Sequence, residues 1–450
     1  MRGFGRSVFA AVLAGVGFQV AASLAAAPVT ANWIGTWGYV PLPPPPGAPI
    51  PPASPPPTPP ALTPLGAFVP PPAAPPPRPA APPLIDNPGN VPVDTTTADL
   101  ANVTVRQVVR VSVGGVRLRL RFSNEHSIFP LPLGAVHVGE AGADGTVMAG
   151  SDRIVTFGGL TSVVLPAGAP VLSDPIDLAT RPLEKLYIST HVPGPVPTQF
   201  LPRSLFQYVA GRPGDFAGAA VLPGARLMRI PPYVTLVEVE TTAPAAVVVT
   251  LGDSITQGTA STANAFRSWP DRLAERLAPR HWAVVNAGIG GNRLLRYGLG
   301  PSALARLDRD VLSVPGLKAV ILLEGINDIG VGLRSSASGE PVSAEALETA
   351  DRQIIIRAHE HGVRVIGATL TPYQGSFYST PPGEMVREAL NHWIRSSNAF
   401  DGIIDFAPAV ADPANPLAID HRYNDSDHLH PNDAGYKAMA DAIDLSLFTQ

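Results

Sequence analysis

From residue 244 onward, short apolar runs alternate with segments of helical periodicity. The first run, Ala246–Leu251, contains no charged residue. Strands that are buried on both faces read as continuous apolar runs, and helices between them connect parallel strands. The pattern therefore predicts a three-layer α/β fold, with one parallel sheet covered on both faces. The other expected strands are 282–286, 318–323, 363–369 and 403–406, and the expected helices are 269–277, 304–312, 343–361, 384–396 and 433–447.

Between about residues 100 and 240 the hydrophobic pattern has a period of two. Residues 103–113 and 116–122 alternate in this way on either side of Gly114-Gly115, which predicts a hairpin. We expect a β-sandwich of jelly-roll type before the α/β part, because no segment of helical period intervenes. The arginines at 117, 119 and 121 either bind an acidic ligand or form the solvated face of the sheet. Further expected strands are 135–138, 153–157, 162–165, 185–191 and 227–238.

Prolines are concentrated in one short stretch. Residues 41–92 hold 25 of the chain's 53 prolines, and 41–85 contain a single charged residue, Arg78. Such a segment cannot donate regular backbone hydrogen bonds and lacks the apolar bulk for a core, so we expect it to be extended or disordered. Residues 33–39 just before it resemble a short aromatic strand. We therefore predict a proline-rich insertion at about 41–92 within a β domain that spans 32–243, with a separate α/β domain at 244–450.

The first residues have the layout of a secretory signal peptide. Arg2 and Arg6 precede an uncharged apolar run at 8–24, and small residues follow up to Ala31. We expect a signal peptide at 1–31 with cleavage after Ala31, and hence a secreted or periplasmic protein. The alternative is an uncleaved membrane anchor, although the apolar run is short for a membrane span. No other stretch is apolar enough for a membrane helix.

The composition excludes several classes of site. The net charge is −4, which argues against a nucleic-acid-binding surface. The chain has no cysteine, so it has no disulfide, thiolate zinc site, iron–sulfur cluster or cysteine nucleophile. A nucleophile in this chain is therefore most simply an oxygen.

Polar residues cluster where the expected parallel strands end, which is where ligands bind in such sheets. Ser254 follows the first strand directly. A serine hydroxyl needs a base to take its proton, and His430 is the candidate because Asp427, three residues earlier, can orient its imidazole. The backbone N–H of Ser254 and the Asn327 amide could stabilise an oxyanion. The four clusters are 251–258, 286–293, 324–330 and 427–433.

Each cluster also has a simpler interpretation. The Gly-Asp-Ser tripeptide occurs in ordinary turns, and Asp427 with His430 could cap a helix. The glycines at 288, 290 and 291 do not have the G-x-G-x-x-G spacing of a dinucleotide site. His428 and His430, with Asp425 and Asp427, could suggest a metal, but zinc hydrolases usually draw histidines from more than one motif. We expect neither a metal nor an organic cofactor.

The four clusters together resemble the SGNH/GDSL hydrolase family. The matching blocks are 252–254, 286–292, 325–328 and 427–431, in the family's order, with Ile255 where the family name has leucine. The Gly-x-Ser-x-Gly elbow of α/β-hydrolases is absent from the sequence. The β region is similar to the extra domain of a bacterial secreted subgroup, to which the proline-rich tract is an insertion.

The resemblance implies a doubly wound, flavodoxin-like sheet and a cofactor-independent serine hydrolase. It implies Ser254 as nucleophile, with His430 and Asp427 as its partners. It also implies an oxyanion hole formed by Ser254, Gly291 and Asn327.

These observations predict a secreted serine esterase that cleaves carboxylic esters through an acyl-enzyme. The β domain in an exported protein favours acetyl or short acyl groups on a polysaccharide, although small-molecule esters fit as well. The alternatives are a lipase or lysophospholipase, an O-acyltransferase and a non-catalytic glycan-binding protein. A lipid substrate would favour an apolar rim, to which Arg293, Leu294, Leu295 and Tyr297 could contribute. The β domain could instead be structural, covering a sheet edge or shaping one wall of the cleft.

Overall fold

A computed structural model describes residues 32–41, 100–142, 145–196, 205–230, 232–334 and 342–449. The expected signal peptide at 1–31 lies outside these residues, as does almost all of the expected proline-rich insertion at 41–92. The first described strand, β1 (Asn32–Gly38), begins directly after the expected cleavage position.

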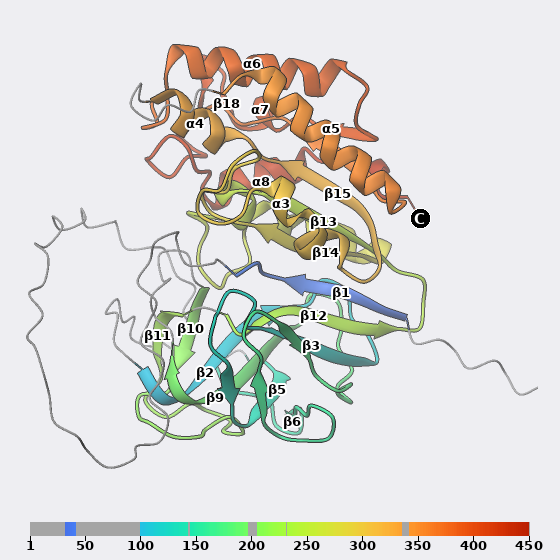
Figure 1. Ribbon diagram of the computed structural model, residues 1–450, viewed down its shortest axis with the longest axis vertical. Helices are drawn as coiled ribbons and strands as arrows, with labels where there is room; N and C mark the ends of the chain where they lie inside the picture. Colours follow the sequence, from blue (N-terminus) through green and yellow to red (C-terminus); the bar gives the residue numbers. More distant parts are fainter. Residues whose placement is uncertain are drawn as a thin grey trace, which may run out of the picture. The chain divides into compact units, whose positions relative to one another are not determined.

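The α/β part is built on a parallel sheet of five strands (Figure 1). Its strand order is β14-β13-β15-β16-β17, so the chain winds first to one side of β13 and then to the other. This is the doubly wound, flavodoxin-like order that was expected. Every residue of β13 is buried, in agreement with its uncharged sequence. The strands are β13 (Ala246–Gly252), β14 (Trp282–Gly288), β15 (Leu317–Leu323), β16 (Arg364–Ala368) and β17 (Gly402–Ile404).

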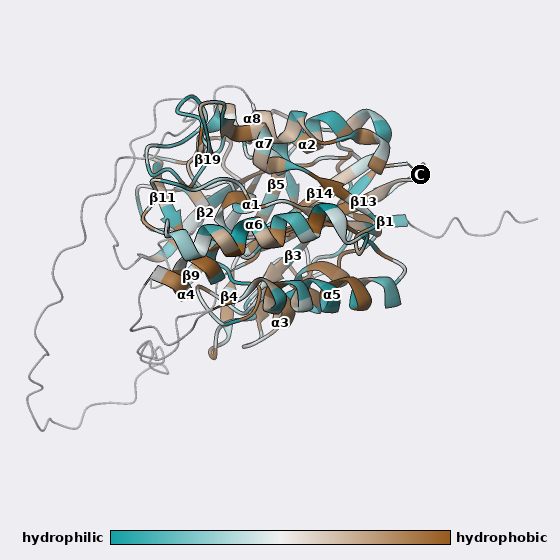
Figure 2. Cartoon of the chain, turned by 90° about the horizontal axis from the view of Figure 1, so that it is seen from above, coloured by the Kyte–Doolittle hydropathy of each residue, from teal (hydrophilic) through white to brown (hydrophobic). Residues whose placement is uncertain are grey.

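Helices cover both faces of this sheet. Figure 2 shows α2, α7 and α8 on one side of β13 and β14, and α3 and α5 on the other. The expected signals of α5 are present: the Ser343 side chain accepts the N–H of Ala346, and Gly362 follows the helix with a φ of 67°. The helices are α1 (Ser254–Gln257), α2 (Trp269–Leu277), α3 (Ala303–Leu307), α4 (Ile326–Arg334), α5 (Ala344–Glu360), α6 (Pro381–Ser396), α7 (Phe406–Val410) and α8 (Asp433–Asp441).

The helices differ from expectation at several positions, one of which is α7, which begins at Phe406 inside the expected strand 403–406. The expected helix 304–312 is α3 followed by a π-helical turn at Asp308–Leu312. The expected helix 433–447 ends as α8 at Asp441, before a 3₁₀ turn at Leu445–Leu447. Helix α4 was not expected, because its Asn, Asp and Gly residues are weak helix formers and resemble a loop.

Two large antiparallel sheets make up most of the β part, which confirms the expected sandwich; β4 (Leu131–Leu133) and β7 (Val163–Leu165) form a further two-stranded sheet. The orders of the two large sheets are β1-β12-β3-β8 and β11-β10-β2-β9-β5-β6, and both contribute to one hydrophobic core. The strands after β1 are β2 (Leu100–Arg110), β3 (Arg117–Ser123), β4 (Leu131–Leu133), β5 (Val136–Glu140), β6 (Arg153–Ile154), β7 (Val163–Leu165), β8 (Pro170–Leu172), β9 (Lys185–Val196), β10 (Leu205–Val209), β11 (Arg226–Ile230) and β12 (Val234–Thr241); a separate pair, β18 (Ala411–Asp412) and β19 (Asn415–Ile419), lies in the α/β part.

The predicted hairpin around Gly114-Gly115 is wrong. Strand β2 pairs with β9 and β10, whereas β3 pairs with β12 and β8 in the other sheet. A side chain at Gly114 would place its Cβ 2.1 Å from the carbonyl oxygen of Thr180, so the glycine allows a close backbone crossing between sheets. The expected strand 227–238 is likewise divided between the sheets, as β11 and β12.

The three arginines of β3 are paired within the protein. Arg117 and Arg119 lie opposite Glu240 and Glu238 on β12, at 2.5 and 2.6 Å. Arg121 contacts Glu125 at 3.0 Å. These pairs fit the interpretation as a sheet face and do not require an acidic ligand.

The sandwich covers the exposed edge of the parallel sheet. The N–H of Val284, on the edge strand β14, donates to Ser112 Oγ at 3.0 Å, and the Ser112 hydroxyl donates to the carbonyl of Thr36 on β1 at 2.6 Å. Strand β1 approaches β14 so closely that a Cβ at Gly38 would lie 2.5 Å from Val285. An uncovered edge strand invites pairing with other chains, and this contact removes that liability. The β part therefore has at least the structural role of covering the edge.

Candidate active site

Ser254 lies at the first turn after strand β13. Strand β13 ends at Gly252, and Asp253 caps α1 by accepting the N–H of Ile255 at 2.8 Å. A Cβ at Gly252 would lie 2.2 Å from Thr256 Oγ1 and 2.5 Å from the carbonyl oxygen of Leu323, so only glycine fits this turn. The turn presents Ser254 at the carboxyl edge of the sheet, with 5% of the residue exposed.

Two residues from the loop before α8 meet Ser254. His430 Nε2 lies 2.8 Å from Ser254 Oγ, and His430 Nδ1 lies 2.5 Å from Asp427 Oδ2. An ionised carboxylate can only accept hydrogen bonds, so His430 Nδ1 carries the proton. His430 Nε2 then accepts a hydrogen bond from the Ser254 hydroxyl. Asp427 Oδ1 also accepts the N–H groups of Leu429 and His430, both at 2.9 Å.

The Asp427 carboxylate is stabilised in its charged form. Partial burial by itself would raise the pKa of Asp427. The hydrogen bonds from the His430 ring and from the backbone N–H groups outweigh burial, so the pKa lies below its ordinary value. By contrast, burial and the neighbouring Asp427 raise the pKa of Asp425.

Asn327 is tied to the turn that carries Ser254. It is 3% exposed near the start of α4, and its Nδ2 donates to Asp253 Oδ2 at 3.4 Å. Its Oδ1 accepts the hydroxyl of Tyr378 at 3.1 Å. Gly291, in the loop after β14, has a φ of 73°, and its neighbour Gly290 donates its N–H to Gln257 Oε1 of α1 at 3.1 Å. The predicted residues thus lie on loops that hydrogen bonds connect around Ser254.

Residues 250–438 match the GDSL-like lipase/acylhydrolase family. The chain contains a GDSL acylhydrolase domain. Its enzyme class is therefore that of a carboxylic ester hydrolase, and the resemblance noted in the sequence is confirmed for this region. No curated protein matches the chain.

Solved structures similar to the GDSL domain have low sequence identity. A G-D-S-L family protein from Desulfitobacterium hafniense is 24% identical, with 44% of this chain and 97% of that chain covered and a TM-score of 0.34. The acetyl xylan esterase AlAXEase is 22% identical, with 44% of this chain and 96% of that chain covered and a TM-score of 0.33. An acetylxylan esterase from Geobacillus stearothermophilus is 18% identical, with 44% of this chain and 93% of that chain covered and a TM-score of 0.35.

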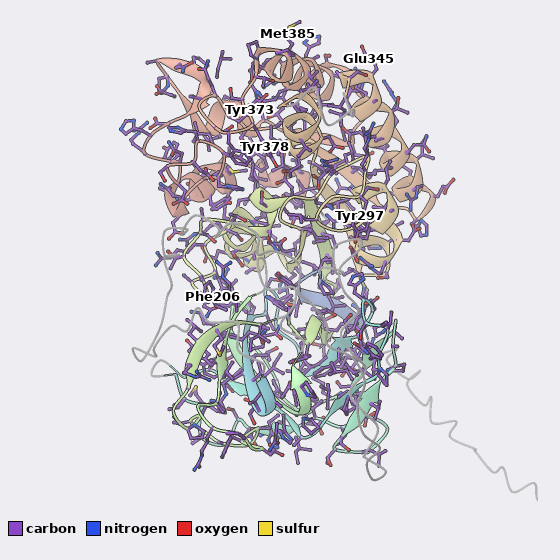
Figure 3. All side chains as sticks on the ribbon, turned by 60° about the vertical axis from the view of Figure 1, so that its left-hand side comes forward. Phe206, Tyr297, Glu345, Tyr373, Tyr378 and Met385 are labelled. Carbon is purple, nitrogen blue, oxygen red and sulfur yellow. The ribbon has the colours of Figure 1, made fainter. Side chains whose placement is uncertain are left out.

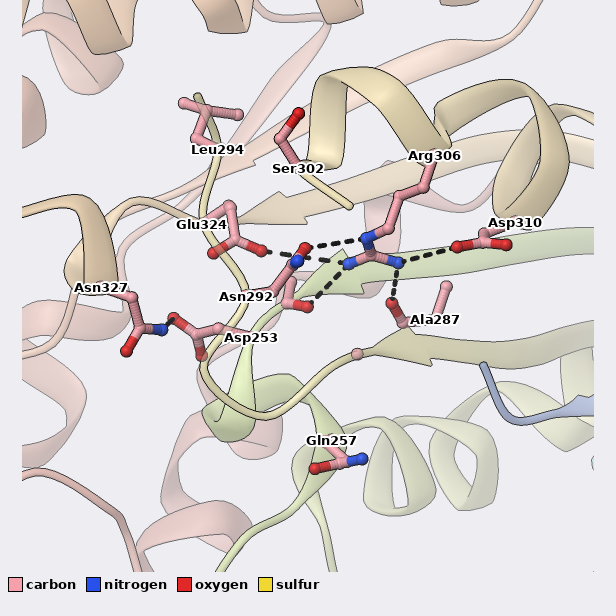
Figure 4. Close-up of polar contacts among 12 residues, drawn as sticks. Asp253, Gln257, Ala287, Asn292, Leu294, Ser302, Arg306, Asp310, Glu324 and Asn327 are labelled. Carbon is pink, nitrogen blue, oxygen red and sulfur yellow. Dashed lines mark hydrogen bonds and ion pairs between the residues drawn. The ribbon is translucent and has the colours of Figure 1, made fainter. Parts of the chain in front are cut away.

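A buried arginine behind the GDSL domain's site was missed by the sequence analysis. The Arg306 guanidinium donates to the carbonyl oxygens of Ala287 and Gly252, at 2.6 and 3.0 Å, and to Asn292 Oδ1 at 2.8 Å (Figure 4). Ala287 and Gly252 lie at the ends of β14 and β13, and Asn292 lies in the loop that carries Gly291. Arg306 therefore connects the turn before Ser254 with the loop that carries Gly291. No sequence signal distinguished it, because neighbouring charges made its helix resemble a surface helix.

Two carboxylates accompany Arg306 in the interior. Its guanidinium lies 3.5 Å from Asp310 and 4.0 Å from Glu324, and the side chains of Arg306 and Glu324 are fully buried. Burial and, secondarily, the charge of Asp253 raise the pKa of Glu324 well above its ordinary value. A raised pKa favours the neutral form of the Glu324 carboxyl. The carboxylate that forms an ion pair with Arg306 is therefore that of Asp310.

The expected apolar rim forms only in part. Leu294 is fully buried, and its N–H donates to Asp328 at 2.7 Å, so it contributes nothing to the surface. Leu295 is half-buried and donates to the same carboxylate at 3.1 Å, whereas Tyr297 is 44% exposed. The Asp328 carboxylate thus holds the backbone of Leu294 and Leu295, while Tyr297 and Leu299 remain exposed.

The part of the chain that the structure describes contains no group of three or more histidine, aspartate or glutamate side chains placed to hold a metal ion. No helix within it is long and apolar enough to cross a membrane.

Proposed function

We propose that the chain is a serine esterase that forms an acyl-enzyme on Ser254. The observation that carries this proposal is the hydrogen-bonded series Ser254–His430–Asp427, with distances of 2.8 and 2.5 Å. Ser254 Oγ attacks the ester carbonyl carbon while its proton moves to His430 Nε2. The carbon–oxygen bond to the alcohol then breaks, and His430 returns the proton to the leaving alcohol oxygen.

Water completes the reaction by the same route. It attacks the acyl carbon, gives a proton to His430, and releases the acid as Ser254 recovers its proton. Asp427 holds the imidazole tautomer and stabilises the imidazolium. The N–H groups of Ser254 and Gly291 and the Nδ2 of Asn327 are the proposed donors to the oxyanion. Loss of one such donor typically lowers kcat by roughly 10²- to 10³-fold.

Short acyl groups, acetyl first, are the proposed substrates on the acyl side. The support is that Leu294 is buried and Leu295 is half-buried, so these two side chains offer little apolar surface to a long chain. Measuring kcat/KM for ethyl esters from acetate to decanoate tests this, and a preference for decanoate would favour the lipase alternative. Adding a sugar acceptor tests the transferase alternative, since acyl transfer would form a new sugar ester in place of free acid.

Ser254→Ala tests the nucleophile. We expect the kcat for an aryl acetate to fall by at least about 10³-fold, because no hydroxyl remains to form the acyl-enzyme. Ser313→Ala, at an exposed serine outside the site, is the matched control and should retain activity. A serine-directed phosphonate should add one label to the wild type, at Ser254, and none to Ser254→Ala. Substantial activity in Ser254→Ala would overturn the assignment.

We also propose that the protein is exported and cleaved after Ala31. The support is the charged and apolar layout of residues 1–31, together with the start of β1 at Asn32, so that cleavage leaves every residue of that strand in place. Mass spectrometry of the protein from the culture medium or periplasm should give an N-terminus at Asn32. An intact N-terminus in the membrane fraction would support the anchor alternative.

A further inference from the structure

A cavity of about 540 Å³ adjoins His430. Its walls come from both parts of the protein: the α/β part contributes His430, Asp425 and the loop 257–268, while the sandwich contributes Trp37, Tyr39 and Phe206 among others. Figure 3 marks Phe206 at the end of the sandwich nearest the α/β part. The volume lies within the range of small-molecule sites, roughly 300–1,000 Å³.

We propose that this cavity binds the alcohol part of the ester, and that this alcohol is a glycosyl unit. The proposal rests on the proposed function at Ser254. His430 must return its proton to the leaving alcohol oxygen, so the alcohol has to lie beside the imidazole. His430 lines the cavity, whereas Ser254, Gly291 and Asn327 do not. The cavity is therefore on the leaving-group side of the site.

Hydrogen bonds connect the sandwich wall with the site. Gln257 Nε2 donates to the hydroxyl of Tyr39 at 3.2 Å, and Gln257 Oε1 accepts the N–H of Gly290 at 3.1 Å. Gly290 adjoins Gly291, the proposed oxyanion glycine. The sandwich wall is thus held at a defined distance from the reacting atoms, as a specificity wall must be.

The lining combines flat aromatic surfaces with hydroxyl and amide groups. Trp37, Tyr39, Phe206 and Phe266 are the aromatic residues of the lining. Arg229 lies over one face of Phe206, and both Arg110 and Lys185 lie over Phe266. The C–H face of a sugar ring can therefore pack against Trp37, Tyr39 and the other face of Phe206. The loop 257–268 adds hydroxyl and amide side chains for sugar hydroxyls. One of them, Asn264, has a buried Nδ2 without a hydrogen-bond partner among the described residues. A fatty acyl chain would leave these polar groups unsatisfied.

Three arginines line the cavity; Arg229 lies over the Phe206 ring at 4.7 Å, and the other two are paired with carboxylates. Arg110 pairs with Glu275 at 2.7 Å and lies over the Phe266 ring at 5.1 Å. Arg267 pairs with Asp433 at 2.9 Å. The polar loop has a defined shape, because Ala260, Asn264 and Phe266 all adopt left-handed conformations with φ between 57° and 68°. Such conformations persist only where surrounding contacts impose them.

Phe206→Ala tests the proposal by a ratio of two substrates. We compare kcat/KM for acetylated xylobiose with kcat/KM for ethyl acetate, whose alcohol is too small to reach the aromatic wall. The ratio should fall by at least about 10-fold in Phe206→Ala, as expected for a lost aromatic contact. Leu160→Ala, at a 68% exposed residue of the sandwich away from the cavity, is the control and should keep the wild-type ratio. An unchanged ratio in Phe206→Ala would overturn the proposal.

Additional measurements separate the possible failures. Thermal unfolding and the variant Phe206→Leu, which keeps apolar bulk but no aromatic face, distinguish misfolding from loss of the subsite. Calorimetry with Ser254→Ala should detect xylobiose, and Phe206→Ala in that background should raise its Kd about 10-fold. If Phe206→Ala instead lowers kcat/KM for ethyl decanoate relative to kcat/KM for ethyl acetate, the cavity binds the acyl chain and the proposal is wrong. Activity surviving in Ser254→Ala would contradict the proposed function itself.

Discussion

The hydroxyl of Tyr378 donates a hydrogen bond to Asn327 Oδ1 at 3.1 Å. This bond fixes which end of the amide is the acceptor, so Nδ2 remains the donor end, where it contacts Asp253. The Tyr378 ring is itself held against Gly330, at which a Cβ would lie 2.3 Å from the ring. Tyr378 is therefore a positioning residue for a proposed oxyanion donor.

Tyr378→Phe should lower kcat more than it changes KM. The variant keeps the ring but removes the donor, so the Asn327 amide loses its fixed orientation. A neutral hydrogen bond contributes about 0.5–1.5 kcal/mol, which corresponds to roughly a 2- to 12-fold loss in kcat. Steady-state kinetics on an aryl acetate measures it, with Tyr297→Phe, at a 44% exposed tyrosine, as the control. An increase in KM at constant kcat would contradict a positioning role.

Arg306→Met should destabilise the protein strongly. The change removes the guanidinium that donates to the buried carbonyl oxygens of Ala287 and Gly252 and to Asn292 Oδ1. Asp310 keeps its ion pair with Arg309. A buried acceptor left without its partner typically costs about 1–3 kcal/mol of the free energy of unfolding, which urea titration measures. Arg395→Met, which breaks an exposed pair with Asp405, should cost less than about 1 kcal/mol. Similar losses in the two variants would show that Arg306 is not the buried link we describe.

The stability of the protein should depend on pH through Asp328. Burial raises the pKa of its carboxyl from the ordinary 3.8 to about 6, although the N–H groups of Leu294 and Leu295 act in the opposite direction. The folded protein thus binds the proton more tightly than the unfolded chain between these values. The contribution to the free energy of unfolding is then greatest below pH 3.8, falls as the pH rises to about 6, and stays low above it.

Asp328→Asn removes this titration. The free energy of unfolding of the wild type minus that of Asp328→Asn should therefore decrease by about 2 kcal/mol between pH 4 and pH 7. Urea titrations at several pH values measure the difference, with Asp441→Asn at an exposed carboxyl as the control. A difference that grows with pH would show that the carboxylate is stabilised in the fold.

Ser112→Ala should weaken the contact between the sandwich and the parallel sheet. The N–H of Val284 would lose its acceptor while remaining buried under the sandwich. An unsatisfied buried donor costs about 1–3 kcal/mol in the free energy of unfolding. Ser396→Ala, at an exposed serine, should change stability by less than about 0.5 kcal/mol. If the two variants unfold alike, the hydrogen bond at the sheet edge contributes little.

Local patterns in the sequence determined the α/β fold and the residues that meet at its edge. Short uncharged runs such as 246–251, alternating with helical segments, indicate buried parallel strands, and the polar residues that follow such strands share one edge of the sheet. Ser254, His430 and Asp427 could be named because they directly follow such a strand or precede a helix. Their contact distances agree with that expectation. The family match confirms the enzyme class by an independent route.

Tertiary structure alone decided how distant segments pair. The alternation around Gly114-Gly115 indicates two strands but not their partners, and those partners lie in different sheets. Tyr39 and Gln257 are 218 residues apart, so no local pattern predicts that they meet beside the active site. Arg306 has the sequence context of a surface residue, and only the packing of α3 against the strand ends buries it. Hydrophobic periodicity reports which face of an element is buried, whereas the partner of a polar group depends on contacts that form only in the folded chain.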